Sequence, residues 1–229
     1  MTPLRVFIGY DPREAVAYHV LSHSILRRAT RPVAIIPLVR TTLGDVYTRP
    51  RGPLESTDFS LTRFLVPYLA GYRGHAVYMD CDMLCLTDLT AILAHVGGDA
   101  RTCPPEAVLV CQHDYTPAGA VKMDGRPQTA YPRKNWSSLM VFNTERCRAL
   151  TPAYVNTASG LELHRFQWLN DEQIGALPLE WNWLVGEYGP NPFAKILHYT
   201  LGGPWFPEWR DSAHAKEWFA EREAMVGDG

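Results

Sequence analysis

Two aspartates separated by a single residue, Asp80 and Asp82, are the residues of this sequence whose type and spacing most clearly suit a chemical role. They follow the apolar run 76–79, which predicts a short buried strand that ends in two carboxylates. Because side chains alternate along a strand, we expect both carboxylates on one face, roughly 7 Å apart, with Cys81 turned back into the protein. Carboxylate oxygens suit a hard divalent cation, and substrate phosphates commonly complete such a site. The alternative is a pair of acids in a strand-to-loop turn that bind nothing.

The elements before this pair predict a βαβ unit. Residues 4–8 and 33–38 have the composition of strands and flank a helical pattern. Asp11, Pro12 and Glu14 mark the start of that helix, as a cap, a first-turn proline and an acid three residues after the cap. A βαβ unit requires parallel strands, and open α/β sheets bind nucleotides in the crevice at the carboxyl ends of their strands. The sequence therefore predicts an α/β fold with a ligand site beside the two aspartates.

The remaining chain predicts further alternation of helices and strands, together with two long loops. Helices are expected over residues 60–70 and 87–96, from residue 152 onward and from residue 211 or 212 onward, and strands over residues 107–111, 139–142, 179–184 and 195–199. The loops, residues 40–58 and 112–135, contain Pro and Gly and show little periodicity. Long loops in compact domains are usually functional or mobile.

Length and composition indicate one globular domain over residues 1–229. Hydrophobic residues make up 46% of the chain and charged residues 20%, so a sizeable core can be buried. The net charge of -2 argues against a protein that binds nucleic acid by neutralising its phosphates. No apolar run reaches the ~20 residues that cross a bilayer, and no secretion signal is recognised. We therefore expect a cytoplasmic protein with at most peripheral membrane association; the oligomeric state is not predicted.

The five cysteines are expected to be reduced core residues. They are odd in number and show no paired metal-binding spacing, and they lie in apolar surroundings. They are Cys81, Cys85, Cys103, Cys111 and Cys147.

The segment around the two aspartates, DFSLTRFLVPYLAGYRGHAVYMDCDMLCLTDL, resembles the retaining family 8 glycosyltransferases of the GT-A fold, in which a helix with an arginine precedes a D-x-D strand. FIGYDPREAVAY, SSLMVFN, NDEQIGAL and HYTLGGPW resemble further motifs of that family and occur in the same order. The resemblance implies a GT-A type, Rossmann-like and mostly parallel central sheet flanked by helices. It also implies a nucleotide-binding half, residues 1–110, and an acceptor-side half with a C-terminal helix, residues 111–229.

The resemblance implies a metal site of Asp80, Asp82 and His198. The ion would be Mn²⁺ or Mg²⁺, and an imidazole among carboxylates favours manganese, because Mg²⁺ prefers oxygen ligands throughout. The alternative for His198 is a strand-end histidine that bonds to the backbone.

A nucleotide-sugar site is implied around this metal. Arg63 resembles the arginine that braces the donor sugar and the D-x-D acids; its alternative is a surface helix position. Asp11 would grip the nucleotide, or else serve only as a helix cap. The expected contact residues are Ile8, Tyr10, Asp11, Arg63, Asp80, Cys81, Asp82, Gly202 and Gly203, the two glycines because their amides would let a diphosphate approach.

Catalytic roles are implied for Arg63 and for the run Asp171, Glu172 and Gln173, which resembles the residues beneath the donor sugar. Solvated residues at a helix start are the alternative for this run. The sequence also departs from the family, because no lysine precedes Pro204 and Trp205. Stabilisation of the leaving group would then fall to the metal, to backbone amides, or to Lys195 or Arg210.

The function implied is transfer of a hexose from a UDP-sugar to a saccharide, glycolipid or other glycoconjugate, with retention at the anomeric carbon. One alternative is a catalytically silent domain that binds a nucleotide sugar, which the missing lysine makes credible. A haloacid dehalogenase-like phosphatase is a weaker alternative, because such enzymes carry D-x-D on their first strand, with Thr or Val where this chain has Leu84.

Overall fold

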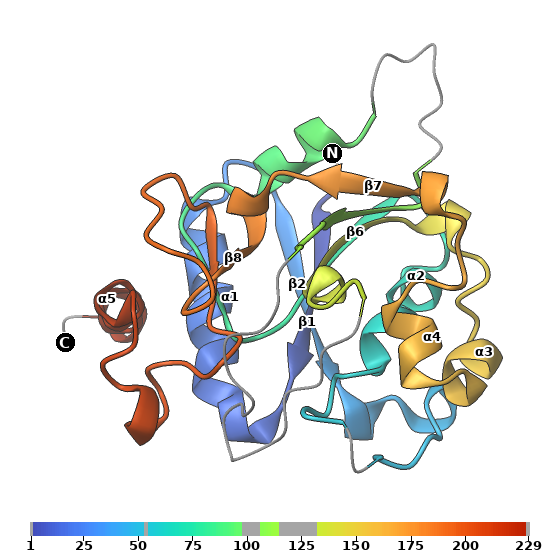
Figure 1. Cartoon of the computed structure of the whole chain (residues 1–229), viewed down its shortest axis with the longest axis horizontal. Coiled ribbons are helices and arrows are strands. Elements are labelled where there is room, and N and C mark those ends of the chain that lie inside the picture. The colour runs from blue at the N-terminus through green and yellow to red at the C-terminus, as the bar shows by residue number, and fades with distance from the viewer. Residues whose placement is uncertain (1, 53–54, 98–105, 115–131, 228–229) are drawn as a thin grey trace.

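The structure is a computed structural model that describes residues 2–52, 55–97, 106–114 and 132–227 (Figure 1). Cys103 and most of the expected loop 112–135 lie outside the described residues. The other four cysteines are buried free thiols, as predicted.

The core of the fold is a six-stranded sheet with the order β2-β1-β3-β6-β5-β7. Only β6 runs against the other five strands, so the predicted mostly parallel α/β sheet is confirmed. The strands are β1 (Leu4–Tyr10), β2 (Val33–Val39), β3 (His75–Met79), β5 (Val108–Cys111), β6 (Leu139–Asn143) and β7 (Ile174–Leu177).

A βαβ unit opens the fold, as predicted. Helix α1 (Ala15–Arg28) connects β1 to β2, which pair in parallel. Asp11 caps the preceding 3₁₀ turn, Pro12–Glu14, by accepting a hydrogen bond from the Arg13 amide. Glu14 does not return a bond to the cap, because its carboxyl oxygens are buried without a hydrogen-bond partner. The capping role expected for Glu14 is therefore wrong.

A second, three-stranded sheet packs beside the first and has the order β4-β9-β8. Its strands are β4 (Met83–Cys85), β8 (Trp183–Leu184) and β9 (Ile196–His198). The strand expected over residues 179–184 is mostly wrong, because Leu179–Asn182 forms a 3₁₀ turn. This turn buries Trp181 and Asn182 together, whereas a strand would direct adjacent side chains to opposite faces.

The remaining helices lie on both sides of the central sheet. Figure 1 shows α1 and α5 on one side and α2, α3 and α4 on the other. Their bounds are α2 (Val66–Leu69), α3 (Pro152–Thr157), α4 (Gly160–His164) and α5 (Ala215–Val226). The helix expected over residues 60–70 is split into a 3₁₀ turn, Thr62–Leu65, and α2. Among the described ranges, none of the helices has the length and apolar character needed to cross a membrane.

Helix α5 is anchored to α1 through a buried acid. Glu221 is 3% exposed, and its carboxylate lies 2.7 Å from both Arg28 Nη2 and His23 Nδ1. Burial alone would raise the pKa of Glu221, but the hydrogen bond and charge of Arg28 outweigh it and lower the pKa below 4.5. A lowered pKa stabilises the fold above pH 4.5, and this contribution is lost as the pH falls through the folded-state pKa.

We expect Glu221→Gln to lower the free energy of unfolding by about 1–3 kcal/mol at pH 7, because a charged hydrogen-bonded acceptor is removed from a buried site. Denaturant unfolding at pH 7 and at pH 4 measures this, and the difference from wild type should shrink at the lower pH. Glu223→Gln is the matched control on the exposed side of the same helix. An equal loss in both variants would contradict the role of Glu221.

Candidate metal and nucleotide site

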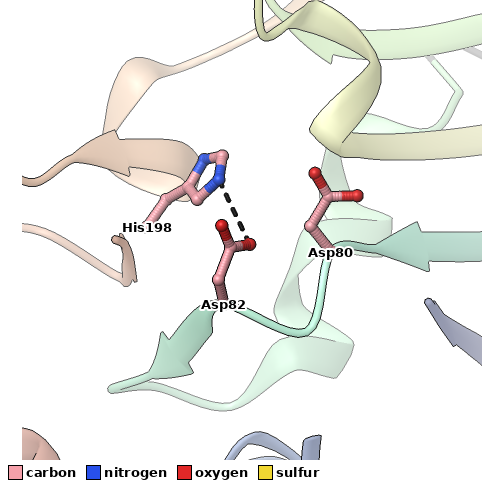
Figure 2. Close-up of side chains that lie close together, drawn as sticks. All are labelled: Asp80, Asp82 and His198. Atoms are coloured by element: carbon pink, nitrogen blue, oxygen red, sulfur yellow. Dashed lines mark ion pairs between the residues drawn. The ribbon is translucent and has the colours of Figure 1, made fainter. Parts of the chain in front are cut away.

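Asp80, Asp82 and His198 converge at the carboxyl end of β3. Each offers one ligand atom, and these atoms lie within 4.8 Å of one another (Figure 2). Strand β9 runs antiparallel to β4 with His198 opposite Met83, and the Tyr199 amide donates to the Asp82 carbonyl at 2.9 Å. The second sheet therefore carries His198 to the two aspartates across more than a hundred residues of sequence.

The local reason for the convergence differs from the expected one. Strand β3 ends at Met79 and β4 begins at Met83, so Asp80 and Asp82 lie in the bend between two strands. Alternation along a single strand does not apply there. In this bend the Asp82 carboxylate faces the imidazole of His198, and the Asp80 carboxylate lies beside it (Figure 2).

Asp80 is held by a hydrogen-bond donor, Tyr78, and by a positively charged group, Arg63. Its Oδ1 accepts from the Tyr78 hydroxyl at 2.6 Å and lies 2.9 Å from Arg63 Nη1. Burial raises the pKa of Asp80 and the charge of Asp82 raises it further, while Arg63 works in the opposite direction. Arg63 is 6% exposed, and its Nη1 also donates to the Ser137 carbonyl at 2.9 Å. The surface alternative for Arg63 is therefore wrong.

His198 contacts polar side chains at both ring nitrogens. Its Nε2 lies 3.3 Å from Asp82 Oδ1, and its Nδ1 lies 2.9 Å from Asn182 Oδ1. The alternative in which backbone groups satisfy this histidine does not match these contacts. Sequence reasoning had no signal for the contact with Asn182, which depends on the 3₁₀ turn before β8.

Asp11 is fully engaged in local structure. It is 1% exposed; its Oδ1 accepts from Arg13 N and Nε, and its Oδ2 accepts from Arg13 Nη2 and the Asp58 amide. Burial opposes ionisation, but these bonds outweigh it and lower the pKa of Asp11. The cap alternative therefore describes Asp11 well, and it also ties the segment at Asp58 to the start of α1.

The other expected nucleotide contacts on β1 and in the D-x-D bend differ in accessibility. Ile8 and Cys81 are fully buried, so only their backbone can face a ligand. Tyr10 is partly exposed at the end of β1, and its ring packs edge-on against Tyr18 with centroids 5.5 Å apart.

Glu14 is an acid near the site that sequence reasoning did not place there. It is 1% exposed, and both carboxyl oxygens are buried without a hydrogen-bond partner. Burial raises the pKa of Glu14 well above 4.5, and the charges of Asp82 and Asp11 raise it further.

A raised pKa for a buried acid means that the fold loses stability as the pH rises above 4.5, because the unfolded chain ionises first. We therefore expect Glu14→Gln to be more stable than wild type at pH 8 in chelator, with the gap closing toward pH 5. Thermal unfolding across this pH range measures the effect. A variant that is less stable than wild type throughout would show that the Glu14 carboxylate has a stabilising partner.

Gly202 and Gly203 are required by the tryptophans that follow them. A Cβ at Gly202 would lie 2.5 Å from Trp209 Nε1, and one at Gly203 would lie 2.0 Å from Trp205 Cζ3. The Gly202 amide already donates to the Tyr199 carbonyl at 2.9 Å. Gly203 is therefore the better candidate for an amide that faces a diphosphate.

The expected catalytic run forms a 3₁₀ turn, Asp171–Gln173, directly before β7. Asp171 and Glu172 are exposed, and Asp171 Oδ1 lies 2.6 Å from Arg133 Nη2. Gln173 accepts a bond from the Asn170 amide at 3.0 Å, as the helix-start alternative predicts. The two cations considered for the leaving group both lie over aromatic rings, Lys195 over Trp181 and Arg210 over Phe219.

Comparison with known proteins places the fold and the family. The chain is similar to the bifunctional glycosyltransferase WbbM, with a TM-score of 0.62 and 17% sequence identity. The match covers 96% of this chain and 52% of WbbM. The chain therefore spans about half the length of WbbM. It is similar to the galactosyltransferase LgtC, solved with donor and acceptor sugar analogs, over 99% of its length and 98% of LgtC (TM-score 0.60, 10% identity). It is also similar to GlyE of Streptococcus pneumoniae (TM-score 0.59, 14% identity), with coverages of 96% and 60%.

These structures establish a GT-A type glycosyltransferase fold. No protein-family model matches the sequence. In sequence, the chain is 46% identical to Protein CDI of Arabidopsis thaliana over 230 residues, which cover 96% of this chain and 86% of that protein. The chain therefore belongs to the family of Protein CDI.

Proposed function

We propose that this protein is a metal-dependent glycosyltransferase that moves a hexose from a UDP-sugar to a saccharide or glycoconjugate, with retention of configuration. The observation that carries the proposal is the buried group of Asp80, Asp82 and His198 at the carboxyl edge of a GT-A type sheet. Nucleotides bind at this edge in open α/β sheets. Residues 1–110 would form the nucleotide side and residues 111–229 the acceptor side.

The donor set fits a divalent cation. Asp82 Oδ1 and His198 Nε2 are 3.3 Å apart, and both side chains are buried. Carboxylate oxygens and imidazole nitrogens are both common ligands of divalent cations. Two carboxylates with one imidazole suit Mn²⁺ better than Mg²⁺. The three residues would hold the ion, which when bound supplies Lewis-acid stabilisation of the diphosphate.

The chain's own residues would bind and orient the donor. Arg63 holds Asp80 in place and would brace the donor sugar from the same position. The Gly203 amide would face the diphosphate, and Tyr10 would pack against the nucleoside. Asp171, Glu172 and Gln173 would lie beneath the sugar and orient its hydroxyls.

In the reaction, the bond between the anomeric carbon and the diphosphate oxygen breaks, and its electron pair leaves with UDP. The acceptor hydroxyl oxygen forms the new bond to that carbon on the face from which UDP departs, and its proton passes to an oxygen of the departing diphosphate. Negative charge develops on the diphosphate, so preorganised positive charge and amides at this place supply the largest catalytic contribution. Because no lysine precedes Pro204, the metal site would have to supply a larger part of the stabilisation of the leaving diphosphate.

A thermal-shift panel of nucleotide sugars with and without Mn²⁺, followed by a turnover assay, tests the proposal. We expect a UDP-sugar to stabilise the protein only with the metal, and UDP to be released from that donor. Binding without hydrolysis or transfer would identify the silent binding domain instead. Release of inorganic phosphate from phosphate esters, without donor binding, would point to the phosphatase.

A further inference from the structure

A series of hydrogen bonds leads from the 3₁₀ turn Trp136–Ser138, directly before β6, to His198. The Ser138 hydroxyl donates to the Asn135 carbonyl at 2.7 Å, and the Asn182 Nδ2 donates to Ser138 Oγ at 2.8 Å. A hydroxyl has one hydrogen, so a serine that donates to a carbonyl can only accept from its other neighbour. The direction of the first bond therefore fixes the Asn182 amide with its nitrogen toward Ser138.

The oxygen end of the same amide then determines which ring nitrogen of His198 carries the proton. Asn182 Oδ1 lies 2.9 Å from His198 Nδ1, and a carbonyl oxygen only accepts, so Nδ1 carries the hydrogen. In the neutral ring, the lone pair is left on Nε2, which faces Asp82 Oδ1. The tautomer of the imidazole thus follows from a hydroxyl that has no contact with it.

Burial of these side chains keeps water from competing for their hydrogen bonds. Asn182 is fully buried, Ser138 is 2% exposed and His198 is 1% exposed. Water therefore has little access to either face of the amide. Metal-bound histidines usually donate their second ring N–H to an acceptor, which sets ring orientation and raises basicity, and loss of that acceptor costs about 10- to 100-fold in metal affinity.

We propose that Asn182 is a positioning residue that holds the proton of His198 on Nδ1 and turns the Nε2 lone pair toward the cation site. The inference rests on the proposed metal-dependent function, because it assigns a purpose to the geometry of a metal ligand. Ser138 acts one step further away by setting the direction of the Asn182 amide.

The test compares Asn182→Leu with Asn182→Asp. Leucine has nearly the same size but accepts no hydrogen bond, whereas aspartate keeps an acceptor for Nδ1–H. We expect Asn182→Leu to bind Mn²⁺ about 10- to 100-fold more weakly than wild type and Asn182→Asp to retain wild-type affinity or exceed it. Mn²⁺ affinity is measured by the electron paramagnetic resonance of the free ion, and thermal unfolding in chelator checks that both variants fold.

Nitrogen NMR of the imidazole in metal-free wild-type protein gives a readout that is independent of metal and of activity. The neutral ring of His198 is expected to carry its proton on Nδ1. A proton on Nε2, or equal Mn²⁺ affinity in Asn182→Leu and wild type, would overturn the inference, as would equal losses in the two variants. If wild type bound no Mn²⁺, the proposed function would fail, whereas the spectrum would still decide the tautomer.

Discussion

Asp82→Asn is expected to abolish Mn²⁺-dependent binding of a UDP-sugar while leaving thermal stability in chelator nearly unchanged. Asp82 is the carboxylate that faces His198 Nε2, and the neutral amide of asparagine lacks the negative charge with which a carboxylate attracts a divalent cation. We expect donor affinity in the presence of Mn²⁺ to fall by more than about 100-fold, because even changes outside the ligand shell cost about 10- to 100-fold.

Titration calorimetry with UDP, with and without Mn²⁺, measures this loss. Asp45→Asn is the matched control, since it makes the same change of charge at an exposed position in the 3₁₀ turn Gly44–Val46. The control should bind as wild type does. Unchanged Mn²⁺-dependent affinity in Asp82→Asn would refute the assignment of this carboxylate to the metal.

Arg63→Met should have the largest effect on stability. It removes the guanidinium group that lies 2.9 Å from Asp80 Oδ1. The buried carboxylate of Asp80 then keeps the hydrogen bond from the neutral Tyr78 hydroxyl but loses its positively charged partner. Removing one partner of a buried ion pair typically costs about 3–5 kcal/mol. Denaturant unfolding in chelator at pH 7 measures the loss.

The pH dependence of this loss has a definite sign. The pKa of Asp80 is already raised by burial, and removal of Arg63 takes away the charge that opposes that shift. An acid with a raised pKa destabilises the fold above the pKa of its unfolded form, so the loss in Arg63→Met should grow from pH 5 to pH 8.

The double variant Arg63→Met with Asp80→Asn should recover part of the stability at pH 8, because it also removes the charge that was left unpaired. A loss that is the same at both pH values and is unaffected by the second substitution would show that packing of Arg63 against Phe59 and Tyr78, and not its charge, is what matters.

Much of the fold could be predicted from local sequence. The βαβ unit follows from two apolar strands and a capped helix, and the buried strand before Asp80 follows from its composition. The short elements could not be predicted in the same way. Strand β7 has four residues and contains a glycine, and the segment before β8 folds as a 3₁₀ turn because tertiary contacts bury Trp181 and Asn182 together.

The candidate site was partly accessible to the same reasoning. Asp80, Asp82 and Arg63 lie within a single motif, and the resemblance added His198 from the far end of the chain. Ser138 and Glu14 lie in segments that resemble family motifs, but the resemblance implied no role for either of them, and Asn182 lies outside those segments. Their place depends on the antiparallel pairing of β4 with β9 and on the start of α1, which periodicity alone does not reveal. The cap at Asp11 was predictable, but not that Arg13 and the Asp58 amide would occupy its carboxylate fully.

Anomalous diffraction from a crystal soaked with Mn²⁺ and UDP tests the central claim most directly. We predict one strong manganese peak bonded to Asp80, Asp82 and His198, with the diphosphate oxygens of UDP completing its coordination. A structure in which UDP is bound but the manganese lies elsewhere, or in which neither binds at this edge of the sheet, would contradict the account.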